Sequence, residues 1–141
     1  MQIALNAPPE VHGHLLEGGW SIVDAGAATR TPDAYRDYLR RSCAEFSVAK
    51  HAYVTTQCGW FSDRSAAYLA TGRPVILEDT GFSNFLPCGE GLLSYRSRHE
   101  ALAAIRAVKE GYAAHCQEAR SVAVNHFDAD RVLSELLERS L

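Results

Sequence analysis

The stretch Gly72-Arg73-Pro74-Val75-Ile76-Leu77-Glu78-Asp79-Thr80-Gly81-Phe82 joins a helix end, a buried strand and a loop. Gly72 suits the position just after a helix, where a left-handed backbone costs little without a Cβ, and Pro74 prevents the helix from continuing. The apolar run 75–77 predicts a short strand covered on both faces. Loops at the carboxyl ends of such strands bind ligands in open α/β sheets, so residues 78–81 predict a binding loop. A plain strand-to-helix turn, capped by Asp79 or Thr80, is the alternative interpretation.

Strand-like and helix-like segments alternate around this stretch, which predicts a mostly parallel sheet with helices on its faces. The other expected strands comprise residues 20–24, 52–56 and 91–95. Turn and capping residues predict helices that begin at residues 8–10, at Pro32 after Thr31, and at Arg64 after Ser62 or Asp63. We therefore expect an α/β protein.

The C-terminal part of the chain changes character, because apolar residues recur there at helical spacing. Ser97 and Glu100 form the sequence pattern of a capping box. Asp128 caps a final helix whose apolar positions are expected to form a buried stripe: Val132, Leu133, Leu136 and Leu137. These helices are interpreted as packing elements, and His115 and His126 as helix-surface residues rather than ligands.

The 141 residues fit one domain, 1–141, with enough chain to bury a core. A net charge of -3, with scattered Lys and Arg residues, makes nucleic acid an unexpected partner. No apolar stretch approaches the roughly 20 residues that span a bilayer, and the first residues lack the pattern of a signal peptide. A cytoplasmic location is therefore expected. The widely spaced cysteines are interpreted as reduced thiols, some of them in the core: Cys43, Cys58, Cys88 and Cys116.

A second informative segment, Gln57-Cys58-Gly59-Trp60-Phe61-Ser62-Asp63-Arg64-Ser65, leads into the helix that begins near Arg64. Gly59 lets a ligand approach the backbone, Ser62 and Asp63 lie where exposed N–H groups begin, and Arg64 offers a planar fork for a phosphate or carboxylate. The pattern favours an anion site. Asp63 pairing with Arg64, or only capping the helix, is the alternative.

Together the two segments resemble the C-terminal, nucleotide-sugar-binding domain of glycosyltransferases of the GT-B fold, over residues 45–137. The resemblance is carried by Ala70-Thr71-Gly72-Arg73-Pro74-Val75, Asp79-Thr80-Gly81 and Gly91-Leu92-Leu93. Gly59-Trp60-Phe61-Ser62 is similar to the Gly-Trp-x-Ser that lies against the donor phosphates in that family. Similarity to bacterial sequences with Glu-Phe-Ser-x-Ala-Lys and Gly-Trp-Phe-Ser-Asp-Arg-Ser adds Glu45, Phe46, Ser47, Ala49 and Lys50.

The resemblance implies a Rossmann-like, three-layer α/β/α domain that binds a nucleotide-diphosphate sugar. The diphosphate is expected to meet backbone N–H groups near Ser62 and Gly81, assisted by Arg64, without a metal or other cofactor. The expected donor-binding residues are Glu45, Lys50, Gly59, Trp60, Ser62, Asp63, Arg64, Glu78, Asp79, Thr80, Gly81 and Phe82. Alternatives stay open for Lys50 and Glu45 as plain surface residues, and for Trp60 and Phe61 as aromatic plugs of the core.

Two departures from the family pattern qualify this hypothesis. The family usually has a ribose-binding Glu five residues before the helix-ending Gly, where this chain has Ala67. GT-B enzymes also place the acceptor and the usual catalytic base on a separate N-terminal domain. The chain is therefore expected to be truncated at its N-terminus, inactive alone, and in need of an acceptor-binding domain or partner chain, with an exposed strand edge that favours a homodimer. A non-catalytic α/β binding or interaction domain is the alternative function.

Overall fold

The computed structural model describes residues 1–5 and 7–140, and the chain divides into two compact units, Met1–Arg41 and Ser42–Leu141. The first unit consists of β1 (Gln2–Leu5), α1 (Pro9–Glu17), β2 (Ser21–Asp24), α2 (Ala25–Ala28) and α3 (Pro32–Arg41). Strands β1 and β2 pair in parallel, with Ile3 opposite Ile22, and α1 lies between them in sequence. β1 was not expected from the sequence, and β2 was expected in one sheet with residues 75–77. That expectation is wrong, because β2 belongs to a separate two-stranded sheet.

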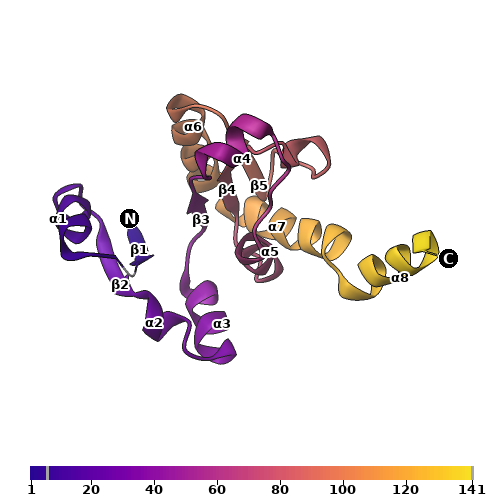
Figure 1. The fold of residues 1–141 in the computed structure, drawn as a ribbon, viewed down its shortest axis with the longest axis horizontal. Helices are drawn as coiled ribbons and strands as arrows, with labels where there is room; N and C mark the ends of the chain where they lie inside the picture. The colour runs from indigo at the N-terminus through magenta and orange to yellow at the C-terminus, as the bar shows by residue number, and fades with distance from the viewer. Residues whose placement is uncertain (6, 141) are drawn as a thin grey trace. The chain divides into compact units, whose positions relative to one another are not determined.

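The second unit contains residues 72–82, which join a helix end, a buried strand and a loop. Its elements are β3 (Glu45–Ser47), α4 (His51–Thr56), α5 (Asp63–Ala70), β4 (Val75–Glu78), the 3₁₀ turn η1 (Phe82–Asn84), β5 (Leu92–Tyr95), α6 (Arg98–Glu110), α7 (Tyr112–His126) and α8 (Ala129–Ser140). The strands form one parallel sheet in the order β3-β4-β5 (Figure 1). The strands predicted around residues 75–77 and 92–93 are confirmed.

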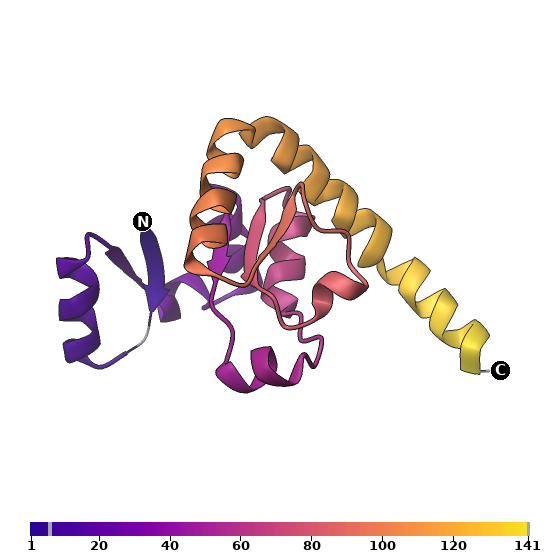
Figure 2. The same cartoon turned by 90° about the horizontal axis from the view of Figure 1, so that it is seen from above.

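Helices cover both faces of the three-stranded sheet. Side chains alternate between the faces of a strand, so Ile76 and Leu93, which pair in register, point to the same side. There they join Tyr95 and the buried residues of α6, including Val108, in the hydrophobic core. Helices α5 and α7 contact one another and the sheet, and Figure 2 shows them on the side opposite α6. The second unit is therefore an α/β fold with a parallel sheet, as expected.

The expected strand at residues 52–56 is wrong, because these residues form most of α4. The hydroxyl of Thr55 donates to the carbonyl of His51 at 3.0 Å, and that of Thr56 donates to Ala52 at 2.7 Å. A threonine hydroxyl can donate to a backbone carbonyl of the preceding helical turn, and this hydrogen bond accommodates threonine in a helix. The β-propensity of such β-branched residues depends on their context. The place beside β4 is taken by β3, in which Phe46 pairs with Ile76.

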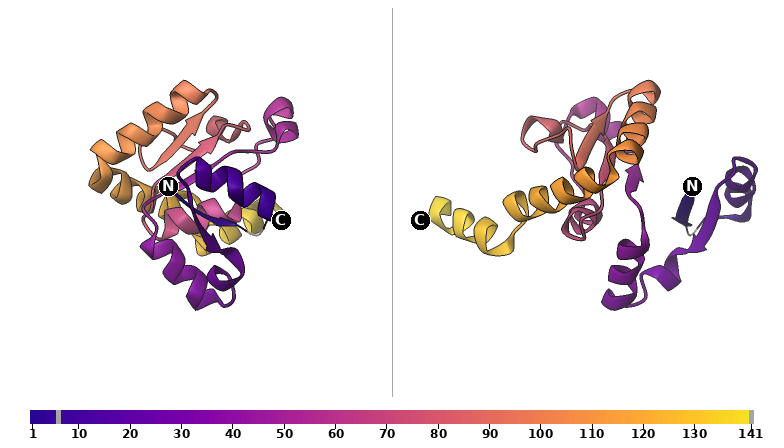
Figure 3. Two further views of the ribbon diagram at one scale, coloured as in Figure 1. Left: turned by 90° about the vertical axis from the view of Figure 1, so that its left-hand side faces the viewer. Right: turned by 180° about the vertical axis from the view of Figure 1, so that it is seen from behind.

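The last helix, α8, begins as expected but does not bury its apolar stripe. The Asp128 carboxylate accepts a hydrogen bond from the backbone N–H of Arg131 at 3.2 Å, which confirms the cap. The four stripe residues are 45 to 63% exposed: Val132, Leu133, Leu136 and Leu137. Figure 3 shows why, since α8 continues beyond α7 and away from the sheet. The expectation of a buried stripe is wrong, because spacing identifies an apolar face but not what covers it.

His115 and the cysteines also differ from expectation. His115 on α7 is buried, and its Nδ1 accepts a hydrogen bond from the backbone N–H of Gly91 at 3.1 Å, whereas His126 is exposed as expected. Gly91 lies so close to the backbone of Ala119 that a Cβ would overlap it, which brings the loop before β5 within reach of His115. All four cysteines are free, three are exposed and Cys116 is half-buried. The expectation that some lie in the core is therefore wrong.

Candidate functional site

A pocket of about 60 Å³ lies at the carboxyl ends of β3 and β4. Because parallel strands end at the same edge of a sheet, the segments that follow them meet there. The pocket is lined by three groups of residues: Ser47, Val48 and Ala49 at and after the end of β3; Trp60, Ser62, Arg64 and Ser65 around the start of α5; and Leu77, Glu78, Thr80 and Phe82 around the end of β4. The site thus combines hydroxyl groups, one guanidinium and one carboxylate with apolar walls.

The first turn of α5 forms one wall of this pocket. Both residues proposed as its cap accept a hydrogen bond from the backbone N–H of Arg64, Ser62 Oγ at 3.3 Å and Asp63 Oδ1 at 2.8 Å. Ser62 is therefore the N-cap, and Asp63 is the first residue of the helix, where its carboxylate suits the positive end. The next residue, Ser65, is fully buried, and its hydroxyl lacks a hydrogen-bond partner among the described residues. A buried hydroxyl without a partner is costly, and here it belongs to a residue that lines the pocket.

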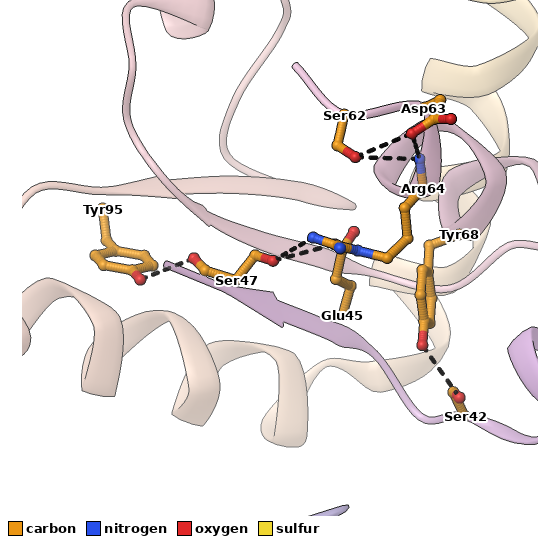
Figure 4. Close-up of polar contacts among 8 residues, drawn as sticks. All are labelled: Ser42, Glu45, Ser47, Ser62, Asp63, Arg64, Tyr68 and Tyr95. Carbon is orange, nitrogen blue, oxygen red and sulfur yellow. Dashed lines mark hydrogen bonds and ion pairs between the residues drawn. The ribbon is translucent and has the colours of Figure 1, made fainter. Parts of the chain in front are cut away.

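The Arg64 guanidinium is held by two residues of β3 (Figure 4). Its Nε donates to Glu45 Oε1 at 2.6 Å, and its Nη2 donates to Ser47 Oγ at 2.6 Å. Glu45 is only 4% exposed, and its Oε2 has no hydrogen-bond partner among the described residues. The Ser47 hydroxyl also lies 3.3 Å from Glu45 Oε1 as a donor. Arg64 therefore pairs with Glu45, and Glu45 is buried rather than a surface residue.

The loops before α5 and after β4 bond directly to each other. The backbone N–H of Gly59 donates to the carbonyl of Thr80 at 2.7 Å, and the Thr80 hydroxyl donates to the carbonyl of Trp60 at 2.6 Å. At Gly81 the φ angle is +99°, and a Cβ would lie 2.8 Å from the carbonyl oxygen of Gln57, so only glycine allows this approach. The N–H groups of Gly59 and Gly81 are both engaged within the protein, the latter by Asp79 Oδ1 at 2.9 Å.

Asp79 serves the loop rather than the pocket wall. Its carboxylate accepts hydrogen bonds from Ser83 Oγ at 2.7 Å and from Arg96 Nε and Nη2 at 2.9 and 2.7 Å. Burial raises the pKa of Asp79, but the hydrogen bonds from Ser83, Arg96 and the backbone of Gly81 outweigh it, so the pKa lies below its ordinary value. A buried carboxylate with this many donors stays ionised and fixes the turn after β4.

Glu78 and the aromatic residues complete the surroundings of the pocket. Glu78 Oε2 accepts a hydrogen bond from the backbone N–H of Ala49 at 2.9 Å, which ties β4 to the segment after β3. Trp60 is 54% exposed, and its ring centroid lies 5.2 Å from that of Tyr53. Phe61 packs between Phe82 and Phe127, at centroid distances of 5.5 and 5.2 Å. Phe61 therefore plugs the core, whereas Trp60 borders the pocket.

The expected donor-binding residues thus divide into those that line the pocket and those near it. Six line it: Trp60, Ser62, Arg64, Glu78, Thr80 and Phe82. Glu45, Gly59, Asp63, Asp79 and Gly81 support those residues through the hydrogen bonds given above. Lys50 stands apart as an exposed residue preceding α4, with its Nζ 5.6 Å from the centre of the Tyr53 ring. Ala67, at the place of the family's ribose-binding Glu, lies half-buried on α5.

Three polar residues that shape the site are absent from the expected donor-binding residues. Ser65 and Ser47 line the pocket, and Arg96 holds Asp79. Arg96 directly follows β5, so the rule that pointed to residues 78–81 after β4 also points to it. Ser47 follows Glu45 by two positions on the same face of a strand, but the strand was not recognised. Ser65 ends the Gly-Trp-Phe-Ser-Asp-Arg-Ser segment, but a serine inside a helix does not by itself indicate a ligand contact.

The site can offer hydrogen bonds to a small ligand from hydroxyl groups and a guanidinium, and can accept one at a carboxylate.

Among residues 1–5 and 7–140, no three His, Cys, Asp or Glu side chains gather as metal ligands. Within the same residues, no helix has the length and apolar character needed to cross a membrane. No protein-family model, curated protein or solved structure matches this chain.

Proposed function

We propose that the Ser42–Leu141 unit binds a nucleotide-diphosphate sugar, as the donor-binding domain of a glycosyltransferase of the GT-B type. The observation that carries the proposal is the buried, unpartnered hydroxyl of Ser65 in a pocket beside Arg64, at the carboxyl ends of two parallel strands. This is where ligands of open α/β sheets bind. The resemblance of the surrounding segments to the GT-B donor domain supplies the ligand class.

The size of the pocket supports one phosphoryl group rather than a whole donor molecule. A volume of about 60 Å³ has room for a few water-sized groups. A phosphoryl group placed there accepts hydrogen bonds from Ser65 and the Arg64 guanidinium, next to the positive end of α5. The rest of the donor extends past Trp60, whose exposed ring offers a face for stacking.

The charges around the pocket favour a ligand that carries hydroxyl groups as well as phosphate. Arg64 is partly neutralised by the buried Glu45, and Glu78 brings a second carboxylate to the pocket wall. A bare polyanion meets repulsion from these groups, whereas a sugar hydroxyl can donate to Glu78. Binding is therefore expected to be weak, and Ala67 removes the family's ribose-binding carboxylate as a further contact.

Transfer of the sugar requires a partner in this proposal. The acceptor and the usual catalytic base lie on a second domain in GT-B enzymes, so the role proposed for this unit is to bind the donor. The N–H groups of Gly59 and Gly81 are engaged within the protein, so recognition of the phosphate falls to the first turn of α5 and the side chains around it. No metal is needed where a guanidinium and a helix terminus balance the charge.

A non-catalytic interaction domain is the second candidate, and the exposed stripe on α8 favours it. Four large apolar side chains on one helix face are 45 to 63% exposed: Val132, Leu133, Leu136 and Leu137. An exposed apolar helix face is typical of surfaces that bind another protein. In this alternative the pocket is a remnant of the fold and binds no donor.

Titration with nucleoside diphosphates tests the proposal. We expect uridine, guanosine or adenosine diphosphate at millimolar concentration to shift the amide signals of residues 59–65 and 78–83. Arg64→Ala is expected to weaken binding by about 1.5 kcal/mol, the low end for a charged hydrogen bond, because its side chain is half exposed. Ser65→Ala removes only one hydroxyl and is expected to weaken binding as well.

Exposed residues of α8 provide matched controls. Arg131→Ala and Ser134→Ala make the same chemical changes on a helix outside the pocket and should leave binding unchanged. No amide shifts with any of the three diphosphates, or shifts that are the same in Arg64→Ala, would favour the interaction domain.

A further inference from the structure

We infer that Glu45, together with Ser47, is a positioning residue that orients the Arg64 guanidinium toward the phosphate pocket. The inference rests on the proposed function, since it assigns a role within that site. Glu45 is absent from the pocket lining, whereas Ser47 and Arg64 line it. Glu45 therefore reaches a ligand only through the residue that it holds.

The hydrogen bonds to Glu45 and Ser47 fix the plane of the Arg64 guanidinium as well as its distance from β3. Glu45 and Ser47 lie two positions apart in β3, so their side chains leave the same face of the strand. They accept from Nε and Nη2, two nitrogens of one planar group, both at 2.6 Å. Two bonds to one rigid fork define its orientation, which a single bond does not.

Ser47 joins these contacts into one network. Its hydroxyl accepts from Arg64 Nη2 and donates to Glu45 Oε1 at 3.3 Å, so the carboxylate receives bonds from both partners (Figure 4). The backbone carbonyl of Ser47 in turn accepts from the hydroxyl of Tyr95 on β5 at 2.8 Å. Glu45 and Ser47, which hold Arg64, therefore belong to the sheet and not to a loop. This keeps the hydrogen-bonding nitrogens of the Arg64 guanidinium in a fixed position.

Glu45 has two opposite effects on a bound anion. Its hydrogen bond orients Arg64, which favours binding, while its negative charge offsets the charge of Arg64, which disfavours binding. Glu45→Gln removes the charge and keeps an acceptor oxygen of the same shape. Glu45→Ala removes the charge and the acceptor together, so the difference between these two variants isolates the positioning effect.

The experiment uses the full chain with inorganic pyrophosphate as the probe, followed by calorimetry. We expect Glu45→Gln to bind pyrophosphate at least as tightly as the wild type and about tenfold more tightly than Glu45→Ala. Ser47→Ala keeps the charge of Glu45 and loses one anchor, so its affinity should fall by about threefold. In the Arg64→Ala background, Glu45→Gln and Glu45→Ala should bind equally. Glu110→Ala, on the exposed surface of α6, is the control and should bind as the wild type does.

A second readout reports on Arg64 without any ligand. The Nε–H proton of Arg64 is expected to give a slowly exchanging NMR signal in the wild type and in Glu45→Gln, and to lose this protection in Glu45→Ala. Unlike affinity, this signal does not depend on the proposed function. If the buried Glu45→Ala substitution prevents folding, Ser47→Ala is measured instead, and the Nη2 protons of Arg64, which donate to Ser47 Oγ, should lose their protection. Protection of these protons that persists in Ser47→Ala would overturn the positioning role.

The possible results separate the two proposals. If wild-type chain binds pyrophosphate but Glu45→Gln and Glu45→Ala bind equally and both keep the Arg64 signal, the positioning role is overturned and the pocket stands. If the wild type does not bind pyrophosphate or any nucleoside diphosphate, the proposed function fails. In that case, loss of the Arg64 signal in Glu45→Ala still supports the positioning of Arg64 by Glu45. A signal that stays protected in Glu45→Ala overturns this positioning role.

Discussion

Asp79 and Arg96 form a two-hydrogen-bond ion pair that joins the end of β4 to the end of β5, with the carboxylate 1% exposed and the Arg96 side chain 65% exposed. Parallel strands are not joined by a hairpin at their ends. Here the side chains that follow the two strands, Asp79 and Arg96, hold these ends together. The ion pair also keeps Asp79 charged beneath the turn that carries Thr80 and Gly81.

Replacing Asp79 by Asn should reduce the free energy of unfolding by about 1–3 kcal/mol at pH 7. The folded-state pKa of Asp79 lies below its ordinary value, so this stabilisation is fully present above the unfolded-state pKa of about 3.9 and is lost as the pH falls through the folded-state pKa. Urea unfolding of the wild type and of Asp79→Asn, at pH 7 and at pH 3, measures this stabilisation. The gap between wild type and Asp79→Asn should narrow in acid, and a gap of equal size at both pH values would contradict the assignment.

Tyr95 is expected to ionise only in strong alkali. Burial, and then the nearby negative charge of Glu78, raise the pKa of Tyr95 to about 12. Because the neutral phenol is favoured in the fold, its contribution is present below the unfolded-state pKa of about 10 and is lost as the pH rises toward 12. The difference in phenolate absorbance between wild type and Tyr95→Phe measures this titration. A Tyr95 signal that titrates near pH 10 in folded protein would show that the phenol is solvated.

The sequence predicts well those secondary-structure elements that are determined by residues close to one another in the chain. Residues 75–77 form a strand because three apolar residues follow a helix-ending Gly and a Pro, and all of these signals lie within a few residues of one another. β3 has no such signal. Its first residue, Glu45, is buried, and its partner Arg64 lies nineteen positions later in the sequence. Residues 52–56 show the converse, since their β-branched residues favour a strand and their hydroxyl groups bond within a helix.

The same distinction applies to the candidate site. Ser62 and Asp63 are recognisable from sequence alone as the residues that begin a helix, and Ser62 is the N-cap while Asp63 is the first helical residue. The place of Ser47 at the pocket depends on a strand that sequence did not reveal. His115 looks like a surface residue in a helical pattern, and it is buried because the loop at Gly91 comes close to α7.

Substitutions in the α8 stripe should leave stability almost unchanged. Leu136→Ser is expected to alter the free energy of unfolding by less than about 0.5 kcal/mol, because Leu136 is 59% exposed. Leu69→Ala, at a fully buried leucine of α5, should cost about 2–5 kcal/mol by the same urea measurement. Sedimentation of wild type and Leu136→Ser at high concentration then tests self-association. A large loss of stability in Leu136→Ser would mean that the stripe is covered in solution.

Gly81→Ala should destabilise the loop after β4. The new Cβ meets the carbonyl oxygen of Gln57 at 2.8 Å, and the φ angle of +99° is one that alanine rarely adopts. We expect a loss of about 1–3 kcal/mol in the free energy of unfolding. Gly89→Ala is the matched control, because Gly89 also has a positive φ but its Cβ would have open space. Equal losses in the two variants would mean that the approach to Gln57 contributes nothing.

The hydrogen bonds between Thr80 and the segment at Gly59 and Trp60 have a consequence for the thermodynamics of ligand binding. Both loops are ordered against each other by bonds within the protein, of 2.7 and 2.6 Å. A ligand therefore finds a preorganised surface, and its binding loses little conformational entropy of the backbone. The heat capacity change on binding should be correspondingly small, since no loop folds and little apolar area leaves water.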